Sequence, residues 1–498
     1  MNRLAVINVV GLTETLIGEH TPRIAAFRQK GALTHIAPAF PAVTCTAQSN
    51  YLTGTPPAQH GIVGNGWYER GLAEVQFWKQ SNHLVQRPKI WDALRRASAR
   101  GDHPPTVSNC FWWFNMYSTV DYSLTPRPIY RADGAKIFDI YSWPHSIRTE
   151  IKKDLGDFPF FAFWGPAAGV KTLHGSADCA TRWIAEAAKW MESKFSPTLN
   201  LVYLPHLDYN LQRHGPFNVP VNVNSRPIGG RQLNPATIPD LRSIDDIAGE
   251  LIQFFESRGV GVVLLSEYGL INVDTAVHLN RIFREHGWLA LKDECGSDVL
   301  DAGASRVFAV ADHQVAHIYL NDPALENTVR DVLEKTPGLD QVLGADEISA
   351  AALAHPRTGD LLAVAAENAW FTYYYWLDDA RAPDFARTID IHRKPGYDPV
   401  ELFLDSRIAA PQLKIAWRLL QKRLGFRMLM DVIPLDATLV RGSHGRRPGD
   451  PKHWPVIITN AVELPGANPL ESTEIFSVLQ RALNPAFMGH YNHTHRGA

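Results

Sequence analysis

A segment near the start of the chain carries the residue types of a nucleophilic site. Residues 40–46 read Phe-Pro-Ala-Val-Thr-Cys-Thr, a pattern that predicts a strand end, a turn bearing Thr44, and the start of a helix. The free backbone N–H groups and the positive dipole end of that helix would attract an anion such as a phosphoryl group. Thr44 is therefore a candidate nucleophile. The alternative is that Thr44 and Thr46 only cap the helix.

Three short apolar segments predict buried strands, and each is followed directly by polar residues. The segments are residues 4–10, 199–204 and 260–265. Short, nearly continuous apolar runs of this kind are typical of strands in a mostly parallel sheet. They are followed by Gly11-Leu12-Thr13, by His206-Leu207-Asp208 and by Ser266-Glu267-Tyr268. Because ligands bind beyond the carboxyl ends of strands in open α/β sheets, we expect these polar residues to converge.

Several motifs occur in the order in which a known family has them. They are Phe40-Pro41-x-x-Thr44, Leu52-Thr53-Gly54, His60-Gly61 with Asn65, Asp208 with Gly215-Pro216, Ser266-x-x-Gly269, and Gly442-Ser443-His444-Gly445. Over almost its whole length the chain resembles the nucleotide pyrophosphatase/phosphodiesterase branch of the alkaline phosphatase superfamily. The resemblance implies an α/β fold with a mostly parallel central sheet flanked by helices.

The same resemblance implies roles for individual residues. It implies a phosphoryl-transfer hydrolase in which Thr44 attacks phosphorus on a pair of zinc ions and Asn65 donates a hydrogen bond to a phosphoryl oxygen of the substrate. Asp208 and His444 match two ligands of one metal. The chemistry needs such help, because an alcohol is a poor nucleophile near neutral pH and a metal ion favours its alkoxide.

The chain departs from the family pattern at several metal-ligand positions. Val10 stands where the family has Asp, Gln212 where it has His, and Glu267-Tyr268 where it has Asp-His. Glu267 and Thr44 would remain near one metal, and Asp208 and His444 near the other, with Gln212 in the place of the missing imidazole. Zinc favours nitrogen, sulfur and carboxylate ligands, so a standard two-zinc centre is in doubt.

Three arrangements could compensate for the lost ligands. Substitute ligands such as His206, Asn210 or His214 could surround Asp208, or a single magnesium or manganese ion could bind Glu267 and Asp208. The third arrangement has no metal and uses cationic side chains. We expect a divalent metal, zinc before magnesium or manganese, with fewer than two ions as an open alternative.

A smaller α/β or α+β unit is predicted at residues 285–400, inserted into a catalytic core of residues 1–284 and 401–498. Such an insert often covers the crevice and selects the substrate. Its charged stretch contains Arg381 and Arg393, which either bind a substrate anion or belong to a solvated loop. Asp312-His313 and His317 either face the cleft or tie a strand.

Composition restricts the partners. Lys plus Arg number 49 and Asp plus Glu 51, a net charge of -2, so no global charge attracts nucleic acid or an anionic membrane. The four cysteines have no CxxC spacing. We therefore expect a cytoplasmic hydrolase acting on a small phosphorylated molecule, without nucleic-acid or membrane partners and with the oligomeric state open. The alternative function is a degenerate family member that binds a phosphorylated metabolite without hydrolysis or serves a biosynthetic step.

Overall fold

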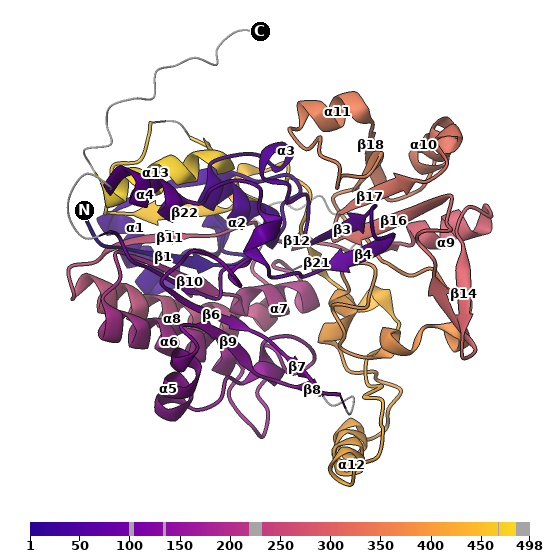
Figure 1. Ribbon diagram of the computed structural model, residues 1–498, viewed down its shortest axis with the longest axis horizontal. Helices are drawn as coiled ribbons and strands as arrows, with labels where there is room; N and C mark the ends of the chain where they lie inside the picture. The colour runs from indigo at the N-terminus through magenta and orange to yellow at the C-terminus, as the bar shows by residue number, and fades with distance from the viewer. Residues whose placement is uncertain (99–103, 133–135, 219–231, 467, 485–498) are drawn as a thin grey trace.

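A large mixed sheet forms the centre of the protein (Figure 1). The computed structural model describes residues 1–98, 104–132, 136–218, 232–466 and 468–484. In spatial order the sheet consists of β23 (Leu470–Glu471), β2 (Ala32–Ala37), β22 (Val456–Thr459), β11 (Gly261–Leu265), β1 (Leu4–Val9), β10 (Leu199–Leu204), β5 (Val107–Cys110), β6 (Tyr122–Pro126) and β9 (Ile140–Trp143).

The middle of this sheet is parallel and its flanks are mixed. Strand β1 pairs in parallel with β10 and β11, and β5 continues the parallel set to β6. Strand β22 runs antiparallel to β11 and β2, and β9 runs antiparallel to β6. All six residues of β1 are buried, as expected for a central strand covered on both faces.

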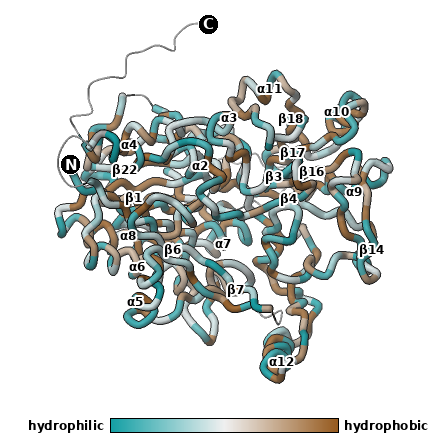
Figure 2. The backbone as a smooth tube through the Cα atoms, viewed as in Figure 1, coloured by the Kyte–Doolittle hydropathy of each residue, from teal (hydrophilic) through white to brown (hydrophobic). Residues whose placement is uncertain are grey.

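Helices cover both faces of the sheet, which is why the central strands are buried and mostly apolar. On one face lie α5 (Ser146–Leu155), α6 (Cys179–Phe195) and α8 (Ile238–Glu256), and on the other α2 (Thr44–Thr53), α4 (Ile90–Ser98) and α13 (Ile475–Leu483) (Figure 1). Figure 2 shows hydrophobic residues along β1, at the centre of these layers. Helix α1 (Pro22–Lys30) packs against α8.

A second, smaller sheet with its own apolar cluster lies beside the core. It is antiparallel and has the order β16 (Val307–Asp312), β17 (Val315–Leu320), β19 (Leu361–Ala365) and β18 (Leu339–Leu343). The helices α9 (Leu279–Glu285), α10 (Glu326–Glu334) and α11 (Ala345–Ala350) belong to this unit. An aromatic cluster extends it from Val273 to Val440, so its packing is wider than residues 285–400, and those boundaries stay a prediction.

The described chain also has further α-helices and strands. They are α3 (Pro57–His60), β3 (Gly66–Glu69), β4 (Glu74–Phe77), β7 (Ile129–Tyr130), β8 (Lys136–Ile137), α7 (His206–His214), β12 (Ile271–Asn272), β13 (Thr275–Val277), β14 (Leu291–Glu294), β15 (Ser297–Leu300), β20 (Ala369–Phe371), α12 (Pro411–Arg423) and β21 (Gly442–Ser443). Within the described ranges, no helix combines the length and the apolar content that crossing a bilayer requires.

Candidate active site

Thr44 is the first residue of α2, at the edge of the sheet where β1 ends. The N-cap position belongs to Val43, and Thr44 makes no capping hydrogen bond. The Thr44 hydroxyl lies instead 3.4 Å from the hydroxyl of Tyr268, which follows the end of β11. Thr44 is only 3 % exposed. Its hydroxyl therefore contacts a polar network, and a substrate reaches it only if part of that network moves.

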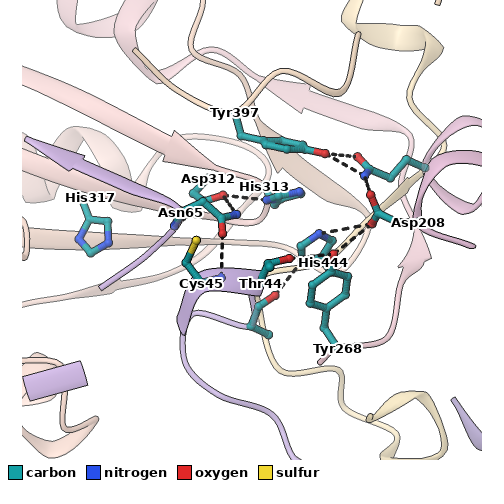
Figure 3. A network of polar contacts seen from close by, with 12 residues as sticks. Thr44, Cys45, Asn65, Asp208, Tyr268, Asp312, His313, His317, Tyr397 and His444 are labelled. Carbon is teal, nitrogen blue, oxygen red and sulfur yellow. Dashed lines mark hydrogen bonds and ion pairs between the residues drawn. The ribbon is translucent and has the colours of Figure 1, made fainter. Parts of the chain in front are cut away.

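Asp208 contacts three side chains of this network, Tyr268, Gln212 and His444 (Figure 3). It lies in the first turn of α7, which follows β10 directly. Tyr268 donates its hydroxyl hydrogen to Asp208 Oδ1 at 3.2 Å, and Gln212 Nε2 donates to Asp208 Oδ2 at 2.6 Å. Gln212 is also 2.9 Å from the hydroxyl of Tyr397. A hydrogen-bonded chain thus connects Thr44 with Asp208 through Tyr268.

Four rings form a stacked column beside Asp208. The ring centroids of Tyr268 and His444 are 3.5 Å apart, those of His444 and His313 3.7 Å, and those of His313 and Tyr397 3.6 Å. His444 Nδ1 lies 2.7 Å from the Ala42 carbonyl oxygen, and Nε2 faces Asp208 Oδ1 at 3.9 Å. The column joins the second unit to the core.

The turn between β16 and β17 brings the second unit to the site. His313 and Gln314 form a two-residue hairpin loop, and His313 has φ +62°, as such tight turns require. Asp312, at the end of β16, accepts hydrogen bonds from the backbone N–H of Asn65 at 2.8 Å and from Asn65 Nδ2 at 3.1 Å. Asn65 Oδ1 in turn accepts from Cys45 N at 3.1 Å, which fixes Asn65 against the start of α2.

Glu267 belongs to a second cluster of buried polar side chains next to Thr44. Asn8 Nδ2 donates to Glu267 Oε1 at 2.6 Å, and Gln48 Nε2 donates to the same oxygen. The Thr44 hydroxyl also stabilises the charged form of Glu267. Two buried acceptors, Asn8 Oδ1 and Glu267 Oε2, have no hydrogen-bond partner among the described residues. Unpaired buried oxygens are costly, so they mark a place where a further donor or a cation would fit.

Burial sets the protonation of these groups. It raises the pKa of Asp208 to about 7, against hydrogen bonds from Gln212 and Tyr268 that lower it. It raises the pKa of Glu267 to about 8, although its hydrogen-bond donors act in the opposite direction. Burial lowers the pKa of His313 and of His444 well below the usual value. Both imidazoles are therefore neutral at physiological pH.

The donor set does not fit two zinc ions. Only Asp208 and His444 retain zinc-ligand chemistry on one side, because Gln212 directs its amide nitrogen to Asp208. In the part of the chain that the structure describes, no three His, Cys, Asp or Glu side chains gather into a group that could hold a metal. On the other side Asn8, Glu267 and Thr44 offer oxygen alone, a set that suits one hard ion such as magnesium or manganese better than zinc.

Four other candidates lie apart from this network. His206 Nε2 is 2.8 Å from Asp240. His317 ties β17 to the core, because Nε2 lies 3.0 Å from the Val63 carbonyl oxygen and Nδ1 accepts from Gly359 N at 3.1 Å. Arg381 pairs with Asp293 and Asp298, and Arg393 pairs with Asp384. Both arginines already bind carboxylates at the surface, so their substrate-binding role stays a prediction.

Sequence reasoning missed two residues of the site. Gln48 lies four residues after Thr44, and that helical spacing puts both on the same face of α2, a pattern that could have indicated it. Tyr397 reaches the site from a distant segment, and nothing in its local sequence pointed there.

The chain shares its fold with solved hydrolase structures. A phosphonoacetate hydrolase from Sinorhizobium meliloti 1021 in complex with phosphonoformate is 16 % identical, with a TM-score of 0.57 over 97 % of this chain and 96 % of that one. Murine ectonucleotide pyrophosphatase/phosphodiesterase 5, in an inactive form in complex with AMP, is 14 % identical, with a TM-score of 0.53 over 97 % of this chain and 95 % of that one. The fold class is therefore alkaline-phosphatase-like.

The family follows from the sequence match. The family model of type I phosphodiesterase / nucleotide pyrophosphatase matches residues 4–398, and the chain belongs to this family. A curated relative, an uncharacterized pyrophosphatase/phosphodiesterase of Schizosaccharomyces pombe, is 21 % identical over 282 residues, which are 54 % of this chain and 46 % of the relative. The match thus spans less than half the length of that relative.

Proposed function

We propose that this protein hydrolyses a phosphodiester or pyrophosphate bond of a small molecule, with Thr44 as the nucleophile. The observation that carries the proposal is the hydrogen-bonded chain from the Thr44 hydroxyl through Tyr268 to Asp208. Family membership supports the reaction class. The bound AMP and phosphonoformate of the two structural neighbours support a small phosphorylated substrate.

The proposed reaction has two steps. Thr44 Oγ1 attacks phosphorus, the bond to the leaving oxygen breaks, and the hydroxyl proton moves through Tyr268 to Asp208. A general base is most effective when its pKa lies near the working pH, and the pKa of Asp208 near 7 meets that condition. Water then attacks phosphorus and the bond to Thr44 Oγ1 breaks. Asp208 returns its proton through Tyr268 to Thr44, and the proton that water releases goes to the leaving group. Asn65 and the N–H groups that begin α2 would stabilise the phosphoryl oxygens.

We further propose that Asn8, Glu267 and Thr44 hold one magnesium or manganese ion in place of the two zinc ions that the resemblance implies. The two unpaired buried oxygens of Asn8 and Glu267 support this site. When bound, such an ion would favour the alkoxide of Thr44 and offset negative charge on the phosphoryl group. After treatment with a chelator, magnesium or manganese should raise the melting temperature of the wild type more than zinc does, and Glu267→Gln should remove that difference.

Thr44→Ala tests the nucleophile. Hydrolysis of bis(p-nitrophenyl) phosphate should fall by about three orders of magnitude or more, as it does when nucleophiles are removed from other enzymes, whereas Thr44→Ser should retain part of the activity. Thr46→Ala is the matched control, because Thr46 is buried in the same helix and its hydroxyl donates to the Ile62 carbonyl oxygen at 3.4 Å, away from Tyr268 and Asp208. Equal activity of the Thr44→Ala and Thr46→Ala proteins would exclude Thr44 from the mechanism.

A further inference from the structure

Helix α12 (Pro411–Arg423) forms a surface away from the candidate active site. It projects from the body of the protein beside the hairpin of β7 and β8 (Figure 1). Lys422 Nζ donates to the Lys136 carbonyl oxygen at 3.2 Å, which connects the helix to β8. None of its side chains belongs to the network around Thr44.

The two faces of α12 have opposite environments. On the inner face Lys414 and Arg418 both bind Asp431, and Ile415 packs against the aromatic cluster of the second unit. An apolar stripe with spacings of four, three and four residues lies on the other side. It consists of Leu413 (72 % exposed), Trp417 (57 %), Leu420 (45 %) and Leu424 (64 %). Such a stripe normally faces a protein core, but this one faces solvent.

Further exposed apolar side chains lie after the helix and on the hairpin that Lys422 contacts. Phe426 and Leu429 follow α12, and Ile137 and Phe138 lie at the neighbouring strand β8; all four are exposed. Figure 2 shows hydrophobic and hydrophilic residues alternating along α12. Exposed apolar side chains gathered on one side of a helix mark a contact with a partner or a membrane.

The charge of this segment identifies the partner class. Residues 407–430 contain six Lys and Arg and no Asp or Glu, although the whole chain has a net charge of only -2. Three of the six, Arg407, Lys414 and Arg418, pair with the flanking Asp405 and Asp431. Arg423 and Arg427 form no ion pair with any residue that the structure describes. A second copy of the chain would bring the same positive charges face to face. A basic segment with Trp, Leu and Phe on its free side is typical of helices that lie in the interface of an anionic membrane.

We propose that α12 and the residues after it dock on the surface of an anionic lipid bilayer. Leu413, Trp417, Leu420 and Leu424 enter the boundary between headgroups and acyl chains, and Arg423 and Arg427 bind lipid phosphates. This inference revises the expectation of no membrane partner, which rested on the net charge of the whole chain. It is independent of the proposed hydrolysis.

Co-sedimentation of the full chain with vesicles tests the proposal. The protein should bind vesicles of phosphatidylcholine mixed with phosphatidylglycerol, bind phosphatidylcholine alone weakly, and release at high salt. The double change Trp417→Gln/Leu420→Gln should lower the partition coefficient by about tenfold or more. Arg423→Gln/Arg427→Gln should lower it by about fivefold per arginine. Leu72→Gln, at a leucine that is 62 % exposed elsewhere, should change nothing.

Two results would overturn the proposal. One is the absence of sedimentation with the anionic vesicles, and the other is sedimentation that the Trp417→Gln/Leu420→Gln protein retains. If light scattering shows a dimer that this double change dissociates, and no vesicles bind, the stripe is an interface between copies of the chain. Circular dichroism checks the fold, and Leu413→Gln/Leu424→Gln, in the same stripe, replaces the first pair if that protein does not fold.

Discussion

Asp312 connects the second unit to the residue that the proposed reaction uses against the phosphoryl oxygens. Its two carboxylate oxygens hold the backbone N–H and the side-chain amide of Asn65. Asp312→Asn preserves the shape but replaces one acceptor with a donor, so Asn65 would lose its fixed orientation. We expect kcat to fall by about tenfold to a hundredfold with KM almost unchanged, because supporting residues of a site act through the groups that they orient.

The control for this change is Asp322→Asn, at a partly exposed carboxylate paired with Arg306, which should leave both constants unchanged. Steady-state kinetics on a p-nitrophenyl phosphodiester separates the outcomes. A loss confined to KM would mean that Asp312 affects substrate binding and not the orientation of Asn65.

For single residues, the sequence predicted which side chains lie near one another at the sheet edge. It did not predict which ion pairs the charged side chains form. Thr44, Asn65, Asp208 and His444 come together because each follows a strand or a turn at the same edge of the sheet. Arg381, in contrast, binds Asp293 and Asp298, residues more than eighty positions earlier in the chain. Such pairs depend on tertiary packing, which local spacing does not encode.

Gly442 allows β21 to lie directly on α7. A Cβ atom at this position would be 2.0 Å from the Leu211 carbonyl oxygen, so any side chain would push the strand away from the helix that carries Asp208 and Gln212. Gly442→Ala should therefore lower the free energy of unfolding by about 1–3 kcal/mol, the usual cost of overpacking. It should also lower activity, because His444 lies two residues further on.

Gly71→Ala is the control for this strand contact, because nothing lies within 4 Å of a Cβ atom added at Gly71. The free energy of unfolding of the Gly71→Ala protein should stay within about 0.5 kcal/mol of the wild-type value. Urea unfolding of the two variants measures the difference. Equal stabilities would show that β21 can shift without cost.

His317 holds β17 against the core as a neutral ring, and this predicts a pH dependence. Burial lowers its pKa to about 4, although the Val63 carbonyl and Asp312 favour the charged form. The unfolded chain, with an ordinary pKa near 6.5, binds more protons than the folded protein below neutral pH. Stability is therefore lost as the pH falls from the unfolded pKa toward the folded one, by about 2 kcal/mol between about pH 7 and pH 5.

His317→Gln isolates this contribution. Gln can donate to Val63 O and accept from Gly359 N without titrating. The His317→Gln protein should therefore lose about 2 kcal/mol less stability than the wild type over the same pH range. The other buried histidines are present in both proteins and cancel in the comparison. Identical pH dependence of the two proteins in urea titrations would exclude His317 as the source.

The elements that the sequence predicted best are the buried parallel strands. The predictions at 4–10, 199–204 and 260–265 are confirmed as β1, β10 and β11, because continuous apolar runs bounded by polar turns have few other interpretations. The antiparallel strand β22 went unpredicted, since its partners β2 and β11 lie hundreds of residues away.

The core and the second unit share polar contacts as well as the ring column at the site. Arg357 Nη1 donates to the carbonyl oxygens of Gly61 at 2.7 Å and Leu84 at 2.9 Å, and its guanidinium lies over the Trp67 ring. Together with the hydrogen bonds of Asp312 and His317, these contacts make separate unfolding of the second unit costly. The loss of each hydrogen bond would leave a polar group of the core without its partner.

We therefore expect the whole chain to unfold in one calorimetric transition, with equal calorimetric and van't Hoff enthalpies. Arg357→Ala should shift that single transition down by about 3 °C, since the loss of two charged hydrogen bonds costs about 3 kcal/mol and a chain of this length has a large unfolding entropy. Arg306→Ala, at a surface ion pair with Asp322, should shift it by less than about 1 °C. Two separate transitions in the wild type would contradict this coupling. The second unit would then open independently of the core, and access of a substrate to the buried Thr44 would not require the core to unfold.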